Sequence, residues 1–264
     1  MHTQVAIIGA GPAGLLLSHL LHLEGIESVV LERQSRAHVE ARIRAGVLEQ
    51  GTVDLLTQTG LGERLNSEGL VHHGIELSFA GRRHRIDLSE LTGGRAITVY
   101  GQHEVVIDLI AARLAAGGDI RFDIADVSLA GIDTDKPIIR FKEAGKSLEI
   151  TCDIIGGCDG FHGVCRQSVP AADLSLYERV YPLAWIGILV KVPPVSDELI
   201  YARHEDGFAL FSMRSPQLSR LYVQCDPDDD IADWPDERIW AALHKRLESS
   251  GDRRLAEGPV LEKV

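Results

Sequence analysis

VAIIGAGPAG, residues 5–14, is the stretch that decides the fold of this chain. Val5 to Ile8 form a short, continuously apolar run, which is typical of a parallel strand buried on both faces. A helical stripe of apolar residues follows from Ala13 to Leu23. The pattern therefore predicts a strand, a glycine turn and a helix.

The glycines of this turn have the spacing of a dinucleotide clamp. Gly9 permits the tight turn, Gly11 lets the backbone approach a pyrophosphate, and Gly14 allows close packing of the helix, whose N-terminal N–H groups are free for phosphates. A second apolar strand, residues 28–31, ends at Glu32, whose carboxylate can accept hydrogen bonds from ribose hydroxyls. The alternative is a purely structural turn. The strand-turn-helix-strand context favours the dinucleotide site.

Composition limits the remaining classes. With 264 residues, 45% of them hydrophobic and 25% charged, the chain is expected to form one or two globular domains. A net charge of -12 argues against a general nucleic-acid surface. We find no secretory signal and no apolar run of membrane-spanning length. The four cysteines form no CxxC pair and lack zinc-finger spacing, so we expect no metal site, no disulfide framework and a reducing cytoplasm.

Two later motifs suit an anionic ligand but are weak alone. RIRAGV at 42–47 places the guanidiniums of Arg42 and Arg44 on one side of an alternating segment, suited to bidentate phosphate contacts. The alternative is a solvated basic turn. CDIIGGCDG at 152–160 predicts an apolar strand that ends in an Asp-Gly turn, and Arg166 follows this turn. An Asp-Gly pair after a strand is also common as a simple turn.

Three apparent strands near the end of the chain carry a possible acid-binding set. In FALFSMR, residues 208–214, strand alternation puts Ser212 and Arg214 on the same face, where a carboxylate could dock. The neighbouring strands offer Tyr201 and Tyr222. The alternative is a surface arginine with two half-buried sheet tyrosines.

Together these motifs resemble the flavin-dependent aromatic hydroxylases, and within them the enzymes acting on 4-hydroxybenzoate. The resemblance lies in GAGPAG with Glu32, RIRAGVLEQG at 42–51, YGQ at 100–102 and CDGFHGVCRQ at 158–167. It implies FAD, with Glu32 at the adenosine ribose, Arg44 at the pyrophosphate and Gln102 at the middle of the cofactor. Gly46 and Val47 would line the isoalloxazine, and Asp159 would serve both FAD and NADPH. The full cofactor set is Gly9, Gly11, Gly14, Glu32, Arg42, Ile43, Arg44, Ala45, Gly46, Val47, Gln102 and Asp159.

The resemblance also implies a reaction. It is the hydroxylation of 4-hydroxybenzoate at the 3-position to 3,4-dihydroxybenzoate, with NADPH and O2, through a flavin C4a-hydroperoxide. Arg214 would pair with the substrate carboxylate, assisted by Ser212 and Tyr222, with Met213 in the same set. Tyr201 would take the phenol proton and His72 would pass it toward solvent, since a histidine titrates near neutral pH. The adjacent His73 leaves open a surface histidine pair instead.

NADPH is the reductant that the resemblance implies. Arg33 and Gln34 match positions that favour the 2′-phosphate, and His162 and Arg166 match further NADPH positions. Arg220 matches a residue that influences where the flavin lies. His38 stands where some members have tyrosine, so it leaves the strength of the NADPH preference open.

The architecture we expect is α/β. Residues 1–175 would form a doubly wound, parallel, Rossmann-like FAD-binding domain, and 176–264 a mostly antiparallel substrate domain. The segment 75–97 alternates like a hairpin and is expected to join the second sheet. Residues 234–247 read as an amphipathic helix over that sheet.

Two alternatives stay open. Members of the resembled family continue past the position of Val264 into a second strand-to-helix motif, and the full-length chain is expected to be a homodimer. A truncated, inactive fragment that binds FAD therefore remains possible, as does a hydroxylase of a related aromatic acid.

Overall fold

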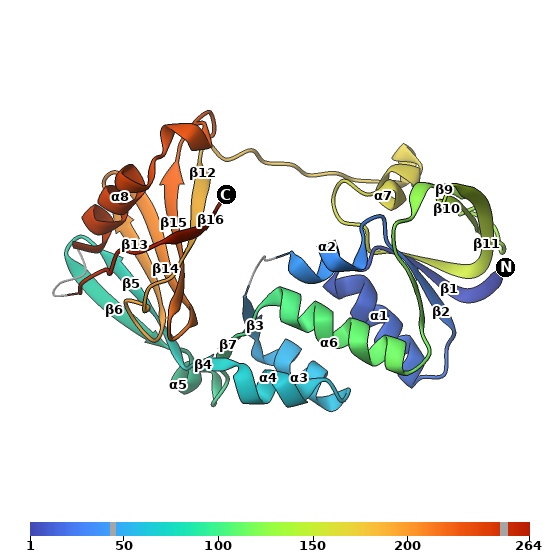
Figure 1. The fold of residues 1–264 in the computed structure, drawn as a ribbon, viewed down its shortest axis with the longest axis horizontal. Helices are drawn as coiled ribbons and strands as arrows, with labels where there is room; N and C mark the ends of the chain where they lie inside the picture. Colours follow the sequence, from blue (N-terminus) through green and yellow to red (C-terminus); the bar gives the residue numbers. More distant parts are fainter. Residues whose placement is uncertain (43–45, 249–252) are drawn as a thin grey trace. The chain divides into compact units, whose positions relative to one another are not determined.

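The computed structural model describes residues 1–42, 46–248 and 253–264. The chain divides into two compact units, each assembled from separate stretches of sequence (Figure 1). The first unit comprises Met1–Ala45, Leu55–Ser67 and Gly101–Tyr177, and the second Gly46–Asp54, Glu68–Tyr100 and Glu178–Val264. Three of the expected cofactor-binding residues, Ile43, Arg44 and Ala45, lie outside the described residues.

The first unit is built on a six-stranded sheet in the order β8-β2-β1-β11-β10-β9. Its strands are β1 (His2–Ile8), β2 (Ser28–Leu31), β8 (Asp119–Arg121), β9 (Ala125–Ala130), β10 (Ile138–Glu143) and β11 (Lys146–Gly157). β1 pairs in parallel with β2 and with the second half of β11, whereas the first half of β11 pairs antiparallel with β10. The expected α/β class, with a parallel glycine-turn sheet, is confirmed.

The helices of this unit include the crossovers between its parallel strands, of which α1 (Pro12–Leu23) and α6 (Gln102–Ala115) pack against the sheet. The others are α2 (Arg36–Ala41), α4 (Gly62–Glu68) and α7 (Val164–Ser168), with α3 (Gln50–Gln58) divided between the units. α1 and α6 lie side by side (Figure 1). Pro12 is the first residue of α1, where its missing N–H leaves no intrahelical bond unmade. The strands contribute fully buried Ala6, Val30 and Leu31.

The second unit contains a seven-stranded sheet in the order β16-β12-β15-β14-β13-β5-β6. Its strands are β5 (Gly74–Phe79), β6 (Arg82–Asp87), β12 (Ala184–Val190), β13 (Leu199–His204), β14 (Gly207–Ser215), β15 (Leu218–Cys225) and β16 (Val260–Lys263). The pairings are antiparallel except that of β13 with β5. A smaller antiparallel sheet joins β3 (Val47–Glu49), β7 (Ile97–Val99) and β4 (Leu70–His72), and α5 spans Leu88–Thr92.

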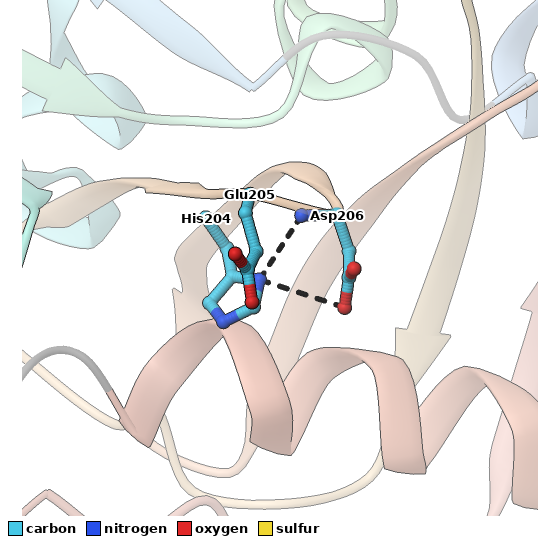
Figure 2. Close-up of side chains that lie close together, drawn as sticks. All are labelled: His204, Glu205 and Asp206. Carbon is cyan, nitrogen blue, oxygen red and sulfur yellow. Dashed lines mark hydrogen bonds and ion pairs between the residues drawn. The ribbon is translucent and has the colours of Figure 1, made fainter.

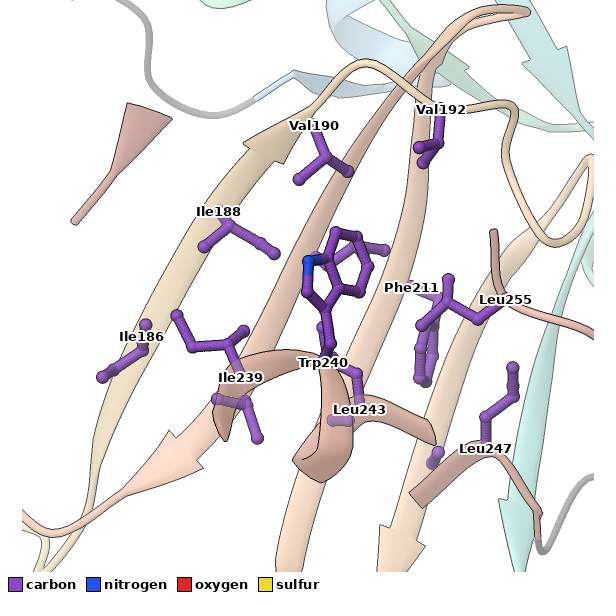
Figure 3. Packing of buried hydrophobic residues seen from close by; sticks show 14 of the residues in the cluster. Ile186, Ile188, Val190, Val192, Phe211, Ile239, Trp240, Leu243, Leu247 and Leu255 are labelled. Atoms are coloured by element: carbon purple, nitrogen blue, oxygen red, sulfur yellow. The ribbon is translucent and has the colours of Figure 1, made fainter. Parts of the chain in front are cut away.

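One face of the seven-stranded sheet is covered by α8 (Asp236–Glu248). Trp240, Leu243 and Leu247 of this helix meet Ile188 and Phe211 of the sheet in one hydrophobic cluster (Figure 3). Burying such side chains contributes about 1.5–3 kcal/mol each. The helix therefore fixes which face of β12, β13, β14 and β15 is inside the core. Side chains that alternate with the core residues must lie on the opposite face, where the candidate acid-binding residues are found.

Within the part of the chain that the structure describes, none of the helices combines the length and the apolar character needed to cross a membrane.

Candidate functional site

A cleft of about 490 Å³ lies in the first unit where β1 and β2 end. We call it the glycine cleft. Residues that the sequence assigns to cofactor or NADPH binding and that line it are Gly9, Gly11, Glu32, Arg33, Gln34, Arg42, Gln102, Asp159 and His162. His38 and His103 line it as well. Residues far apart in sequence thus meet at the carboxyl ends of parallel strands, where ligands bind in open α/β sheets.

The glycines of the cleft are required by its geometry. Gly9 has a φ of +104°, and a Cβ atom there would lie 2.5 Å from the carbonyl oxygen of Cys158. A Cβ atom on Gly14 would overlap the carbonyl oxygen of Gly9. Gly11 is the N-cap residue of α1 and has open space around it. The first turn of α1 carries no acidic side chain, so its N–H groups are available to an anion.

Glu32 is held in place by backbone donors. The N–H groups of Ala10 and Gln34 donate to its two carboxylate oxygens, each at 2.8 Å. Each oxygen keeps a further lone pair that can accept a ribose hydroxyl. The side chain at the end of β2 is therefore fixed to the glycine turn before any ligand arrives.

Asp159 is fixed in a similar way at the start of α7. Its carboxylate accepts the N–H of Cys165 at 3.0 Å. A Cβ atom on Gly163 would overlap that carboxylate, which explains a glycine at this position. Burial and the bond with Asp159 raise the pKa of Cys165 to about 12, so this thiol stays protonated and is a poor nucleophile.

Arg166 lies beside the glycine cleft in a second cavity, of about 550 Å³, that Asp159 and Gly160 also line. Its Nε and Nη2 donate to the carbonyl oxygen of Phe161 at 3.2 and 3.0 Å. Its guanidinium carbon lies 4.2 Å from the centre of the Phe161 ring. Arg166 is thus ordered by the loop that carries His162.

Five of the side chains singled out in the sequence share the face of the seven-stranded sheet that α8 does not cover. We call this the arginine face, and the five residues are Tyr201, Ser212, Arg214, Arg220 and Tyr222. Ser212 stands opposite Arg220, and Leu210 stands opposite both Tyr201 and Tyr222. The β14–β15 register is interrupted between Met213 and Ser215. Met213 alternates with Ser212 and Arg214, so the pleat places its side chain on the other face.

Arg214 is the unusual member of this face. Its Nε and Nη1 atoms are buried and have no hydrogen-bond partner. Burial lowers the pKa of Arg214, Tyr222 opposes that shift, and the like charge of Arg220 adds to it. The space for the guanidinium comes from Gly46, because a Cβ atom there would overlap it. A buried cation without a carboxylate is costly, so this arrangement is suited to an anionic ligand.

The neighbouring Arg220 does have partners. Its Nη1 donates to Glu262 at 2.7 Å and its Nε to the hydroxyl of Tyr222 at 3.3 Å. Ser212 is oriented by a hydrogen bond from its hydroxyl to the carbonyl oxygen of Arg220 at 2.9 Å. Sequence reasoning missed Glu262. The alternation of residues 260–263 is too short a signal to identify a strand.

His72 lies in β4 and is 2% exposed, so it is not part of a surface histidine pair. Neither ring nitrogen has a hydrogen-bond partner. Burial lowers the pKa of His72, while the carboxylates of Glu198 and Asp197 partly oppose that shift. The ring is therefore neutral near pH 7. Its neighbour His73 is exposed to solvent at the surface and bonds Ser89 at 2.8 Å.

Val47 is exposed and begins β3, whereas Gly46 is buried and its carbonyl oxygen accepts the N–H of Tyr100 at 2.9 Å. Both belong to the second unit. Gln102 begins α6 and lines the glycine cleft in the first unit. The sequence expectation assigned all three to one cofactor.

The turn between β13 and β14 gathers His204, Glu205 and Asp206, whose ligand atoms lie within 4.8 Å of one another (Figure 2). His204 Nδ1 accepts the N–H of Asp206 at 3.1 Å. Lys245 of α8 forms an ion pair with Asp206, and Arg246 donates to its carbonyl oxygen at 2.6 Å. The lysine already neutralises the carboxylate, so these contacts account for the cluster as an anchor between turn and helix.

Comparison with known proteins adds the following. A family model described as FAD binding domain matches residues 2–264. The p-hydroxybenzoate hydroxylase of Acinetobacter baylyi is 48% identical over 263 residues, which is 100% of this chain and 65% of that protein. The 12-dehydrotetracycline 5-monooxygenase/anhydrotetracycline 6-monooxygenase of Streptomyces rimosus is 30% identical over 168 residues, 63% of this chain and 32% of that protein. The chain thus spans less than two thirds of the length of these relatives.

Solved structures agree on the fold. The p-nitrophenol 4-monooxygenase PnpA of Pseudomonas putida superposes with a TM-score of 0.81 at 17% identity, covering 100% of this chain and 67% of that one. The flavin-dependent monooxygenase PieE, solved with FAD and substrate, gives a TM-score of 0.77 at 19% identity, covering 100% of this chain and 49% of that one.

Proposed function

The chain belongs to the FAD binding domain family, and from that premise we propose that it forms the cofactor-binding and substrate-binding parts of a 4-hydroxybenzoate 3-hydroxylase. The reaction consumes 4-hydroxybenzoate, O2, NADPH and a proton, and yields 3,4-dihydroxybenzoate, water and NADP⁺. One oxygen atom enters the ring and the other leaves as water. The identity of 48% to a p-hydroxybenzoate hydroxylase supports this choice of substrate.

The glycine cleft has the donors that FAD needs. The N-terminus of α1 would hold the pyrophosphate, and the fixed carboxylate of Glu32 would accept the hydroxyls of the adenosine ribose. Bound FAD supplies the redox chemistry that activates O2. Gln102 and Asp159 line the same cleft and would hold the polar middle of the cofactor.

The observation that carries the substrate assignment is Arg214. Its guanidinium has two buried nitrogen atoms without acceptors. A carboxylate would supply the missing acceptor, because its two oxygen atoms pair with one edge of a guanidinium. Ser212 and Tyr222 place hydroxyls on the same sheet face, so the ligand that this face favours is an aromatic acid.

Tyr201 and His72 are the proposed proton acceptors. The phenol of 4-hydroxybenzoate lies at the opposite end of the ring from its carboxylate, and Tyr201 lies two strands away from Tyr222 on the same face. An ionised phenol is a better nucleophile, so removing its proton favours hydroxylation. The neutral, buried ring of His72 is able to accept a proton from such a relay.

NADPH is the proposed reductant. Arg33 and Gln34 line the glycine cleft directly after Glu32, where a cation would meet a 2′-phosphate. Arg166 of α7 is hydrogen-bonded to the loop that carries His162, which supports a joint role of the two residues toward the same dinucleotide. We also propose a cytoplasmic enzyme that is a homodimer at full length.

The test is a calorimetric titration of 4-hydroxybenzoate into the FAD-loaded chain and two variants. Arg214→Ala should weaken binding by about 100-fold or more, because the carboxylate loses its charged partner. Arg203→Ala is the matched control, since Arg203 is an exposed arginine of neighbouring β13 and its loss changes the net charge equally. Equal affinities for both variants would remove Arg214 from the substrate site.

A further inference from the structure

We propose that Glu262 determines substrate charge: by neutralising Arg220 it leaves Arg214 to receive a single carboxylate, so that the arginine face selects monoanionic over dianionic aromatic acids. This inference rests on the proposed role of Arg214. It assigns a function to a side chain of β16, a strand at the edge of the sheet.

The sheet register places Glu262 and Arg220 on one face. Leu189 of β12 stands opposite Glu262 of β16 on one side and opposite Arg220 of β15 on the other. Residues in such a row across a sheet point to the same side. The long arginine side chain reaches across β12 to its partner, and the Nη1 to Oε2 distance is 2.7 Å.

The rest of the Arg220 side chain is also constrained. Arg220 is 6% exposed, and its guanidinium carbon lies 5.3 Å from the centre of the Tyr222 ring. Gly187 makes room for both side chains, since a Cβ atom there would lie 2.8 Å from the Tyr222 ring and 3.3 Å from Nη2 of Arg220. Arg220 is therefore held in one position with its charge already paired.

The two arginines that interact with Tyr222 differ in charge balance. Arg220 has the carboxylate of Glu262, whereas the buried Nε and Nη1 of Arg214 have no acceptor. Ser212, which stands two residues before Arg214 on the same strand, is directly opposite Arg220, so the two arginines are neighbours on this face and a charge bound at one acts on the other. With Glu262 the three groups sum to one positive charge. Without it they sum to two, which a ligand with two carboxylates would match.

The alternative is that Glu262 only fastens β16 to the sheet. Loss of such an anchor would weaken the binding of every ligand of this face to the same degree. Loss of a charge selector would instead change the ratio of the affinities for a monoanion and a dianion. The ratio is therefore the informative quantity, because a general loss of stability cancels in it.

The experiment is calorimetric titration of 4-hydroxybenzoate and 4-hydroxyphthalate, which bears a second carboxylate, into the FAD-loaded chain and its Glu262→Gln variant. Asp236→Asn is the matched control, because Asp236 pairs with Lys263, the next residue of β16, and its loss changes the net charge equally. We expect Glu262→Gln to shift the affinity ratio about tenfold toward the dianion, and the control to leave it unchanged.

A double variant, Arg220→Gln with Glu262→Gln, restores a single positive charge and should return the ratio to that of the unchanged chain. An unaltered ratio in Glu262→Gln would overturn the inference while leaving the role of Arg214 intact. If the unchanged chain binds neither acid, the proposed function fails and this inference fails with it.

Discussion

The glycine cleft and the arginine face both have features suited to an anionic ligand, but they are made from different parts of the polypeptide. The cleft is built largely from backbone: a left-handed Gly9, the N-terminus of α1, and N–H groups that hold Glu32. The arginine face is built from side chains, with buried nitrogen atoms of Arg214 that lack partners. Backbone sites depend on space, whereas side-chain sites depend on charge balance. The two regions should therefore fail under different substitutions.

The largest effect is expected for Gly9→Ala in the cleft. Alanine at a φ of +104° is strained, and its Cβ atom would lie 2.5 Å from the carbonyl oxygen of Cys158. Together these should cost about 3–5 kcal/mol of unfolding free energy. Gly25→Ala is the control, because Gly25 has a φ of +71° but open space, and should cost about 1–2 kcal/mol. Urea unfolding measures both, and equal costs would show that space at the turn is not limiting.

The corresponding substitution in the second unit removes a buried charge, that of Glu76. Glu76, whose side chain is 8% exposed, pairs with Arg83 at 3.1 Å and with Arg253 at 2.7 Å. Glu76→Gln removes the shared anion and leaves two cations together, which should cost about 3 kcal/mol. Glu149→Gln breaks an exposed pair with Arg140 and should cost under about 0.5 kcal/mol. If urea unfolding shows that Glu76→Gln lowers the free energy of unfolding only slightly, the stability of this unit does not depend on its buried charges.

The smallest effect concerns pH. Burial lowers the pKa of His72 in the folded chain, so on acidification the unfolded chain takes up its proton first, near pH 6.5. Stability from the neutral ring is thus present above pH 6.5 and is lost as the pH falls toward the lower folded pKa. The unchanged chain should lose of order 1 kcal/mol of unfolding free energy between pH 7 and 5 through His72, and His72→Gln should remove that loss. His73→Gln is the control, and identical pH slopes in all three chains would exclude a buried neutral His72.

The same contrast explains what could be predicted from sequence. The glycine turn, Glu32 and the α/β class are encoded within a few tens of residues, because the backbone contacts of the turn are local. Strand alternation was also enough to put Ser212 and Arg214 on one face. By contrast, the partnership of Arg220 with Glu262 depends on the pairing of β15, β12 and β16, which no local pattern specifies.

Burial of single side chains was harder to predict. A His-His dipeptide gives no sign that one ring lies inside β4 while the other reaches the surface. The turn cluster at His204 and Asp206 was missed because its partners lie on α8, forty residues along the chain. In each case the missing information is long-range packing rather than local propensity.

The interleaving of the two units has a consequence for synthesis. The chain passes between them after residues 45, 54, 67, 100 and 177. A ribosome releases the chain from its N-terminus, and domains generally fold as units. Here the parallel strand β11, which completes the middle of the first sheet, emerges only after the hairpin of β5 and β6. That hairpin must in turn wait for β13, its parallel neighbour. Nascent chains of this protein therefore hold two unfinished sheets at once.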